Sequence, residues 1–404
     1  MGGYAVAFLV AAGVTAAVMP LVRRIAIRAG AVVPPNPRGV HTRPMVSLGG
    51  AGMFVGFVVA LAVASQVPQF REMFNGSSEP LGVLIAAAIM FAVGALDDLR
   101  DVSPPAKVAG MVVAGGVLSL FGVQMLFFRV PFVAGDTFVL SADLAPVVTV
   151  LMVVLFANAI NLIDGLDGLA GGIVAIAGTA LFLYSDRLFK NGFLEGSNVA
   201  PLVAVIAVGV CVGFLPYNWH PARIMMGDAG ALFLGLLMAV TTITIGGRAD
   251  YQYSGVTYFF FAPLFIPFVI LGVPIVDTAF SFLRRVLKRR SFSVADKEHL
   301  HHRLMRLGHG PRRTVAILWL WTALLSGVAL IPTYTDQGNA LVPVLILALA
   351  LLLYGLFFPR RGDWEAEVVA ASGGSRVDEG PGDGRRTPVG SGGPADRNRG
   401  AGEA

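Results

Sequence analysis

The sequence predicts an all-α protein that crosses a membrane many times, and three observations support this fold class. Of the 404 residues, 55% are hydrophobic and only 14% are charged, and the mean hydropathy is +0.73, which is more apolar than a soluble protein of this size requires. Apolar runs long enough to cross the hydrocarbon core of a bilayer recur along the chain. Their spacing is typical of helices rather than of the strict alternation found in membrane barrels.

About eleven segments qualify as transmembrane helices. They are residues 4–22, 48–66, 81–96, 106–122, 144–163, 168–184, 199–216, 229–247, 258–283, 315–332 and 340–358. The first has no basic residues before it and is followed by Arg23 and Arg24, so we expect a retained span rather than a cleaved signal peptide. Three prolines within 258–283 predict a kinked helix there.

The loops predict how these helices are oriented. The loops that follow odd-numbered spans, together with the C-terminal tail, hold 25 Lys and Arg residues, whereas the other loops hold 5. Because cytoplasmic loops are enriched in Lys and Arg, we expect the N-terminus outside and the C-terminus in the cytoplasm. Residues 1–361 would form one integral membrane domain. Residues 362–404, rich in Gly, Pro, Ser, Arg and Asp, predict a disordered cytoplasmic tail.

Charge and cysteine content exclude several classes of function. The net charge of +5 arises in the loops predicted to be cytoplasmic, so it favours attraction to anionic membrane lipid, and we expect no nucleic-acid partner. Cys211 is the only cysteine, which excludes an intrachain disulfide and a cysteine-based metal cluster.

The segment NAINLIDGLDGLAGG, residues 158–172, places two amides and two carboxylates between apolar runs. Asn158, Asn161, Asp164 and Asp167 recur every third residue, which on one continuous helix would spread them over half its circumference. Gly165 and Gly168 instead predict that the first helix ends near residue 163 and that the chain then turns. The polar groups could then converge at one helix mouth, although an ordinary polar loop remains the alternative.

Two further cytoplasmic loops carry acids at helix ends. Asp97 and Asp98 would lie at a helix C-terminus, where the dipole opposes them, so a metal, Arg100 or Lys107 should compensate. The alternative is a solvated turn. Asp228 would lie at a helix N-terminus, where a capping role is the alternative. If these acids and those of residues 158–172 cluster, their repulsion of roughly 4 kcal/mol per pair at 4 Å calls for a divalent cation. Oxygen ligands without cysteine favour Mg²⁺, or Mn²⁺.

The first and fifth cytoplasmic loops carry imidazoles and guanidinium groups that suit phosphate oxygens. His41 and Arg43 precede a Gly pair, a pattern that equally fits a basic loop that only sets orientation. His299, His301 and His302 lie beside Arg303. Their spacing is poor for zinc, and charge-assisted contacts to phosphate are the better interpretation.

The motifs LDDLRD, NAINLIDGLDGLAGG, NWHPARIMMGDAG and EHLHHRL occur in this order within residues 37–310. Together they resemble the polyprenyl-phosphate N-acetylhexosamine-1-phosphate transferases of glycosyltransferase family 4. Members transfer a sugar 1-phosphate from a UDP-sugar to a polyprenyl phosphate, with Mg²⁺, and release UMP. The resemblance implies this reaction in the bacterial cytoplasmic membrane, with the active site on the cytoplasmic side. A homodimer is compatible with the sequence.

The resemblance also implies residue roles. Asp228 would be the main Mg²⁺ ligand with Asn161 as a second, Asp97 would be the base for the lipid phosphate, and Asp98 would support it or assist the metal. The residues expected to act with them are His301 and His302 in catalysis, and His41, Arg43, Asn158, Asp164, Asp167, Asn218, Met225, His299 and Arg303 in substrate binding. Where the family has Phe before Met-Gly-Asp this chain has Met225, which would weaken stacking on uracil.

The histidine order His-Leu-His-His-Arg-Leu resembles the N-acetylglucosamine-1-phosphate branch, which starts envelope polysaccharides and cell-wall linkers. The alternative is the phospho-N-acetylmuramoyl-pentapeptide transferase branch, which has three consecutive histidines. An ion-coupled secondary transporter is an alternative of a different class, because intramembrane acids and broken helices also suit transport.

Overall fold

The computed structural model describes residues 2–33, 44–128, 138–246 and 309–335, with short pieces at 271–275, 278–279, 304–305, 343, 346–348 and 350–351. Contacts divide the chain into two units, Met1–Trp364 and Glu365–Ala404, and the second unit lies outside the described residues. The expected cytoplasmic tail therefore stays a prediction.

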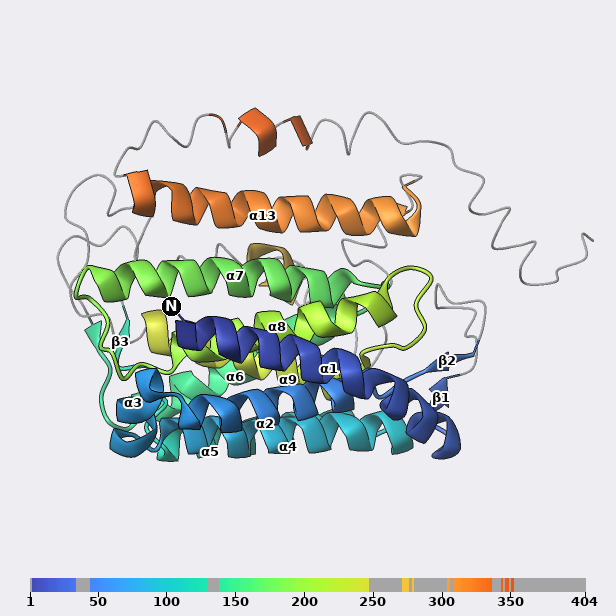
Figure 1. The fold of residues 1–404 in the computed structure, drawn as a ribbon, viewed down its shortest axis with the longest axis horizontal. Helices are drawn as coiled ribbons and strands as arrows, with labels where there is room; N and C mark the ends of the chain where they lie inside the picture. Colours follow the sequence, from blue (N-terminus) through green and yellow to red (C-terminus); the bar gives the residue numbers. More distant parts are fainter. Residues whose placement is uncertain are drawn as a thin grey trace, which may run out of the picture. The chain divides into compact units, whose positions relative to one another are not determined.

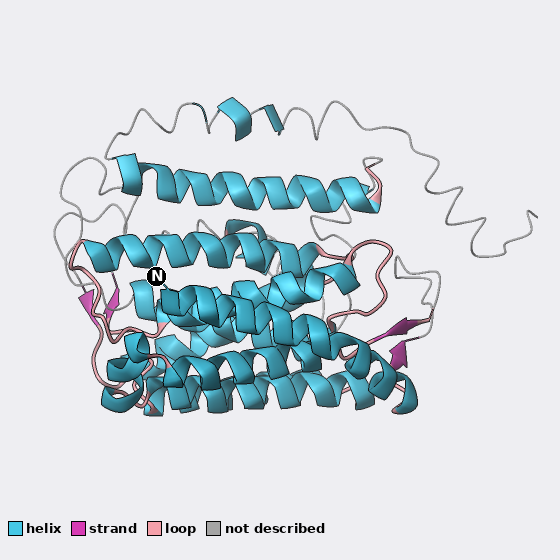
Figure 2. Cartoon of the chain, in the orientation of Figure 1, coloured by secondary structure: helices cyan, strands magenta, loops and turns pink. Residues whose placement is uncertain are grey.

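Helices make up most of the described chain (Figure 1). They are α1 (Gly2–Arg28), α2 (Gly49–Gln66), α3 (Arg71–Gly76), α4 (Glu79–Arg100), α5 (Pro104–Leu120), α6 (Leu144–Ile163), α7 (Leu169–Lys190), α8 (Ala200–Asn218), α9 (Gly227–Gly246) and α13 (Pro311–Thr335). Two short antiparallel ribbons, which the sequence did not predict, lie at opposite ends of the helices (Figure 2). They pair β1 (Val32–Val33) with β2 (Met45–Val46), and β3 (Phe127–Phe128) with β4 (Phe138–Val139).

Eight of these helices are long and apolar enough to cross a membrane: α1, α2, α4, α6, α7, α8, α9 and α13. The predicted span 106–122 corresponds to α5, which is apolar but has 17 residues. The predicted spans 258–283 and 340–358 lie mostly outside the described residues. The multi-pass helical membrane fold is confirmed, whereas the number of eleven spans and the orientation of the termini stay predictions.

Local sequence explains where several helices begin and end. Helix α6 ends at Ile163 and α7 begins at Leu169, as the glycines between them predicted. Gly168 has φ 75°, a left-handed conformation that is accessible to glycine at little cost. Helices α4, α5 and α8 each have a proline at their first turn, where the missing N–H would have had no partner within the helix.

Helix α9 lies at the centre of the bundle. Every residue from 229 to 246 is buried, and the helix packs against α2, α4, α6, α7 and α8. A helix that is apolar on all sides is expected to be enclosed in this way. Outer helices complete the packing, since α1 contacts α2 and α8, α5 contacts α4 and α6, and α13 contacts α7. The position of α9 places Asp228, in its first turn, where several other helices end.

Small residues allow the close helix crossings around α9. A side-chain carbon on Gly94 of α4 would overlap the backbone of Asp228 and Ala229. One on Gly50 of α2 would overlap the backbone of Ala229 and Gly230. Membrane helices that associate through packing use small residues in this way, because apolar side chains gain little by leaving lipid.

Replacing Gly94 by valine should destabilise the protein by about 1–3 kcal/mol, since the crossing of α4 and α9 has no space for the added atoms. Thermal unfolding of detergent-solubilised protein measures the effect. Gly116→Val is the matched control, because a side-chain carbon on Gly116 of α5 would meet no atom within 4 Å. Equal unfolding temperatures for the two variants would contradict this description of the crossing.

Candidate active site

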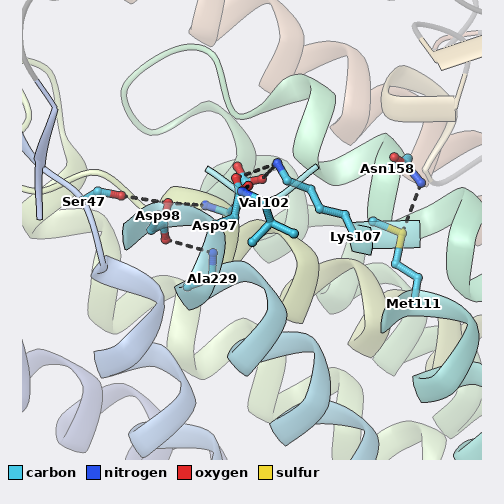
Figure 3. A network of polar contacts seen from close by, with 9 residues as sticks. Ser47, Asp97, Asp98, Val102, Lys107, Met111, Asn158 and Ala229 are labelled. Carbon is cyan, nitrogen blue, oxygen red and sulfur yellow. Dashed lines mark hydrogen bonds and ion pairs between the residues drawn. The ribbon is translucent and has the colours of Figure 1, made fainter. Parts of the chain in front are cut away.

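The ends of α4, α5 and α9 meet in an acidic site (Figure 3). Lys107 in the first turns of α5 places its Nζ atom 2.5 Å from Asp97 Oδ2 and 2.7 Å from Asp228 Oδ2. One ammonium group thus pairs with both carboxyl groups. Lys107 was one of the three groups expected to compensate the acids at the end of α4, and the structure confirms it in that position.

The turn between α4 and α5 holds Asp97 in place. Its Oδ1 atom accepts a hydrogen bond of 2.8 Å from the backbone N–H of Val102, and its carbonyl oxygen accepts one of 3.1 Å from Asp101. Asp101 ends α4 in a left-handed conformation, with φ 49°. The turn thus leaves Oδ2 of Asp97 directed at Lys107.

Asp98 contacts other parts of the chain than Asp97 does. Its Oδ1 accepts hydrogen bonds from the Ser47 hydroxyl and from the backbone N–H of Asp228, each 3.0 Å long. Its Oδ2 accepts one of 3.1 Å from the backbone N–H of Ala229. The carboxylate therefore binds the N-terminus of α9 and the segment before α2 (Figure 3).

The end of the first loop, just before α2, pairs through its backbone with the loop between α8 and α9. We call the loop between α8 and α9 the fourth loop, after its place in the predicted cytoplasmic set. The N–H of Met225 donates to the carbonyl of Val46 over 2.8 Å, and the N–H of Gly49 donates to the carbonyl of Met225 over 2.9 Å. Gly50 makes the same kind of bond, of 2.9 Å, to Met226. The Met225 side chain is half-buried, and its predicted contact with uracil stays a prediction.

The turn between α6 and α7 brings two more predicted residues toward Asp228. The side chain of Asn161, in the last turn of α6, lies near the Asp228 carboxyl group. Asp164 follows the end of α6, and burial raises its pKa to about 8, with further contributions from the charges of Asp228, Asp98 and Asp167. The charges of Asp228, Asp98 and Asp167 act in the same direction as burial, because each disfavours the ionised form of Asp164.

Asp167 and Asn218 join the α6–α7 turn to the fourth loop. The Oδ2 atom of Asp167 lies 2.7 Å from His220 Nδ1 and accepts a 3.1 Å hydrogen bond from the backbone N–H of Ala222. Asn218 accepts a 2.8 Å bond from the N–H of Gly168 and donates one of 3.0 Å to the carbonyl of Ile224. The sequence gives no local sign of a role for His220, because its partner Asp167 lies 53 positions away.

A small cavity of about 180 Å³ lies beside the contact between the α6–α7 turn and the fourth loop. Its lining comprises Asp167, Gly168, Trp219, His220, Arg312, Val315, Ala316 and Trp319. Arg312, near the start of α13, donates a 3.3 Å hydrogen bond to the carbonyl of His220, and the two tryptophan rings meet edge to face with centroids 5.6 Å apart. Helix α13 is thereby fixed to the same loop.

Asn158 makes its contacts away from this cluster. The Asn158 amide donates to the carbonyl of Val154 over 2.7 Å and to the sulfur of Met111 over 3.3 Å, on the side facing α5 (Figure 3). The other six predicted residues lie outside the described ranges: His41, Arg43, His299, His301, His302 and Arg303. Their roles stay predictions.

The side-chain oxygens near Asp228 are of the kind that bind a hard divalent cation. In the ranges that the structure describes, no group of three or more His, Cys, Asp or Glu side chains forms a metal site. Asp228 and Asn161 nevertheless lie near each other and both carry side-chain oxygens of the kind that Mg²⁺ prefers, and Lys107 places a positive charge beside Asp228. These residues therefore fit the predicted Mg²⁺.

Comparison with known proteins shows that this chain is similar to members of one family. A model described as glycosyl transferase family 4 matches residues 80–246, which include the whole of α4 through α9 except the first residue of α4. Decaprenyl-phosphate N-acetylglucosaminephosphotransferase of Mycobacterium tuberculosis (strain ATCC 25618 / H37Rv) is 34% identical over 363 residues, which are 87% of this chain and 89% of the relative. A probable undecaprenyl-phosphate N-acetylglucosaminyl 1-phosphate transferase of Bacillus subtilis (strain 168) is 38% identical over 318 residues, 78% of this chain and 81% of the relative. Undecaprenyl-phosphate alpha-N-acetylglucosaminyl 1-phosphate transferase of Escherichia coli (strain K12) is 24% identical over 340 residues, 84% and 86% of the two chains.

Asn218→Ala should separate the fourth loop from the α6–α7 turn. The change removes the partners of two backbone groups, and a buried group left without one costs roughly 1–3 kcal/mol. We expect a lower unfolding temperature in detergent, whereas Asn75→Ala, at an exposed position of α3, should have no effect. An unchanged unfolding temperature for Asn218→Ala would show that the two hydrogen bonds do not hold the junction.

Proposed function

This chain belongs to glycosyl transferase family 4, and we propose that it transfers N-acetylglucosamine 1-phosphate from UDP-N-acetylglucosamine to a polyprenyl phosphate and releases UMP. The observation that carries the proposal is the junction of Asp97, Lys107 and Asp228 at one end of the helix bundle, in a chain whose relatives are named for this reaction. We also propose that the product starts the synthesis of an envelope polysaccharide or cell-wall linker.

The two alternative functions receive less support. The relatives are named as N-acetylglucosamine phosphate transferases rather than as muramoyl-pentapeptide transferases. A transporter would be expected to place its ionisable residues near the middle of its helices. Here Asp97 and Asp98 lie in the last turn of α4 and Asp228 lies in the first turn of α9.

The reaction brings two anions together, a lipid phosphate and a pyrophosphate. Lys107 supplies positive charge where they would meet. Positioning and neutralisation are the main contributions that a protein makes to phosphoryl transfer. A phosphate oxygen could replace Asp97 as a partner of Lys107, and Asp97 would then accept or exclude the proton of the lipid phosphate.

Asp228 and Asn161 are the residues that would hold Mg²⁺ or Mn²⁺. When bound, the cation would neutralise the pyrophosphate oxygens and stabilise UMP as it leaves. Asp167 and Asn218 would form one wall of the nucleotide pocket, since they fix the turn and the loop beside Asp228. Met225 would lie against the base, and the histidine motif would close over the sugar and the pyrophosphate.

We infer that the protein resides in the bacterial cytoplasmic membrane with the acidic site on the cytoplasmic side. The basic residues at the end of α1 and the start of α13 support this orientation, because α13 begins beside the same loop as the site. In this arrangement eleven spans would leave the N-terminus outside and the C-terminal tail in the cytoplasm.

Purified protein in detergent, supplied with polyprenyl phosphate and Mg²⁺, should release UMP from UDP-N-acetylglucosamine. UDP-N-acetylgalactosamine and UDP-N-acetylmuramoyl-pentapeptide complete the donor panel, and lipid extraction identifies the product. A lipid-linked pentapeptide would overturn the choice of branch. Release of UMP from none of the donors would refute the proposed function.

Asp228→Asn should abolish turnover at all Mg²⁺ concentrations that saturate the wild type, because it removes the charged ligand while keeping the shape of the side chain. The rate of UMP release against Mg²⁺ concentration measures this effect. Extraction yield and unfolding temperature should match those of the wild type. Undiminished turnover in this variant would refute the assignment of Asp228 as the metal ligand.

A further inference from the structure

Asp98 is bound by three donors from two other parts of the chain. Its carboxylate accepts the backbone N–H groups of Asp228 and Ala229, at the first turn of α9, and the hydroxyl of Ser47. A carboxylate at a helix N-terminus is favoured by the partial positive charge there, and it satisfies N–H groups that lack partners within the helix. Here a different helix, α4, supplies the carboxylate.

Gly227 makes this close approach possible. Its φ of 72° is left-handed, and a side-chain carbon at this position would overlap both carboxylate oxygens of Asp98 and the hydroxyl oxygen of Ser47. The chain before Asp228 is therefore shaped to receive the Asp98 carboxylate. The two groups are 130 positions apart in sequence, so this fit is a tertiary feature of the fold.

Building on the proposed function, we propose that Asp98 is a positioning residue that holds Asp228 in place, and that Asp98 is neither the base nor a metal ligand. Both oxygens of Asp98 are directed at backbone N–H groups, whereas Oδ2 of Asp228 is directed at Lys107. Fixing the backbone of Asp228 fixes the direction of its side chain. The adjacent acids Asp97 and Asp98 thus have separate tasks.

Ser47 extends this support to the first loop. It donates to Asp98, and its neighbours on both sides bind the fourth loop through the bonds between Val46 and Met225 and between Gly49 and Met225. The segment that ends the first loop and the segment that begins α9 therefore behave as one unit around the Asp98 carboxylate. A change at Ser47 should reach Asp228 only through Asp98.

Mn²⁺ binding tests the proposal without substrate. Electron paramagnetic resonance titration of the full-length protein in detergent measures the Mn²⁺ affinity, with Asp228→Asn as the reference for loss of the site. Asp98→Asn should weaken the affinity about 10–100-fold, the usual cost of removing a group that orients a metal ligand. Asp101→Asn is the matched control, since it removes an exposed charge three positions away and should leave affinity unchanged. Equal affinities of the two variants would overturn the proposal.

The pH profile of UMP release separates positioning from catalysis by Asp98. For Asp98→Asn we expect kcat to fall and the KM for UDP-N-acetylglucosamine to change little. In the wild type kcat/KM should decrease at low pH, and the variant should show the same decrease at the same pH. Loss of that acidic limb would identify Asp98 as the base and overturn the proposal. A wild-type protein that binds Mn²⁺ but releases no UMP would refute the proposed function, and the Mn²⁺ comparison would still show whether Asp98 supports the cation site.

Ser47→Ala keeps the test decisive if Asp98→Asn does not fold. This variant removes one of the three donors and should weaken Mn²⁺ binding several-fold, less than Asp98→Asn does. Where Asp98→Asn does fold, combining both substitutions should cause no further loss, because Ser47 acts through Asp98. Unchanged Mn²⁺ affinity in Ser47→Ala, or additive losses in the double variant, would overturn the proposal.

Discussion

The acidic end of α4 is stable because the N-terminus of α9 is directed at it. Helix dipoles concentrate negative charge at a C-terminus, and Asp97 and Asp98 add two carboxylates at that point. The backbone N–H groups of Asp228 and Ala229 bind one of them, and the Lys107 ammonium group binds the other. The crossing of α4 and α9 at Gly94 brings the two helix ends together. Packing in the apolar bundle and chemistry at its end therefore depend on the same contact.

Much of the fold could be predicted from the sequence, since long apolar runs and glycines act locally. The end of α6 and the beginning of α7 followed from Gly165 and Gly168, and the clustering of acids followed from their places at helix ends. The unfavourable position of Asp97 and Asp98 at a helix C-terminus also predicted a compensating positive charge, for which Lys107 was one candidate. These inferences need only the spacing of residues and the sign of their charges.

The partners of the site residues could not be predicted in the same way, because they come from distant parts of the chain. Nothing near Asp98 in sequence indicates that its oxygens bind the start of α9. The pairing of Asp167 with His220 and the position of Asn158 against Met111 likewise depend on how helices are arranged. The ribbons β1–β2 and β3–β4 are too short to leave a clear alternation of polar and apolar residues.

The enclosure of α9 has a consequence for biogenesis. Its residues 229–246 are apolar on every side, although none of them is exposed to lipid in the finished bundle. Such a helix can leave the translocon and rest in the bilayer by itself before its neighbours pack around it. Only when α4 has closed on it do the N–H groups at its start meet the Asp98 carboxylate. A newly inserted chain thus carries all its spans in lipid before it has a place for the reaction, and assembly within the membrane is the step that creates the enzyme.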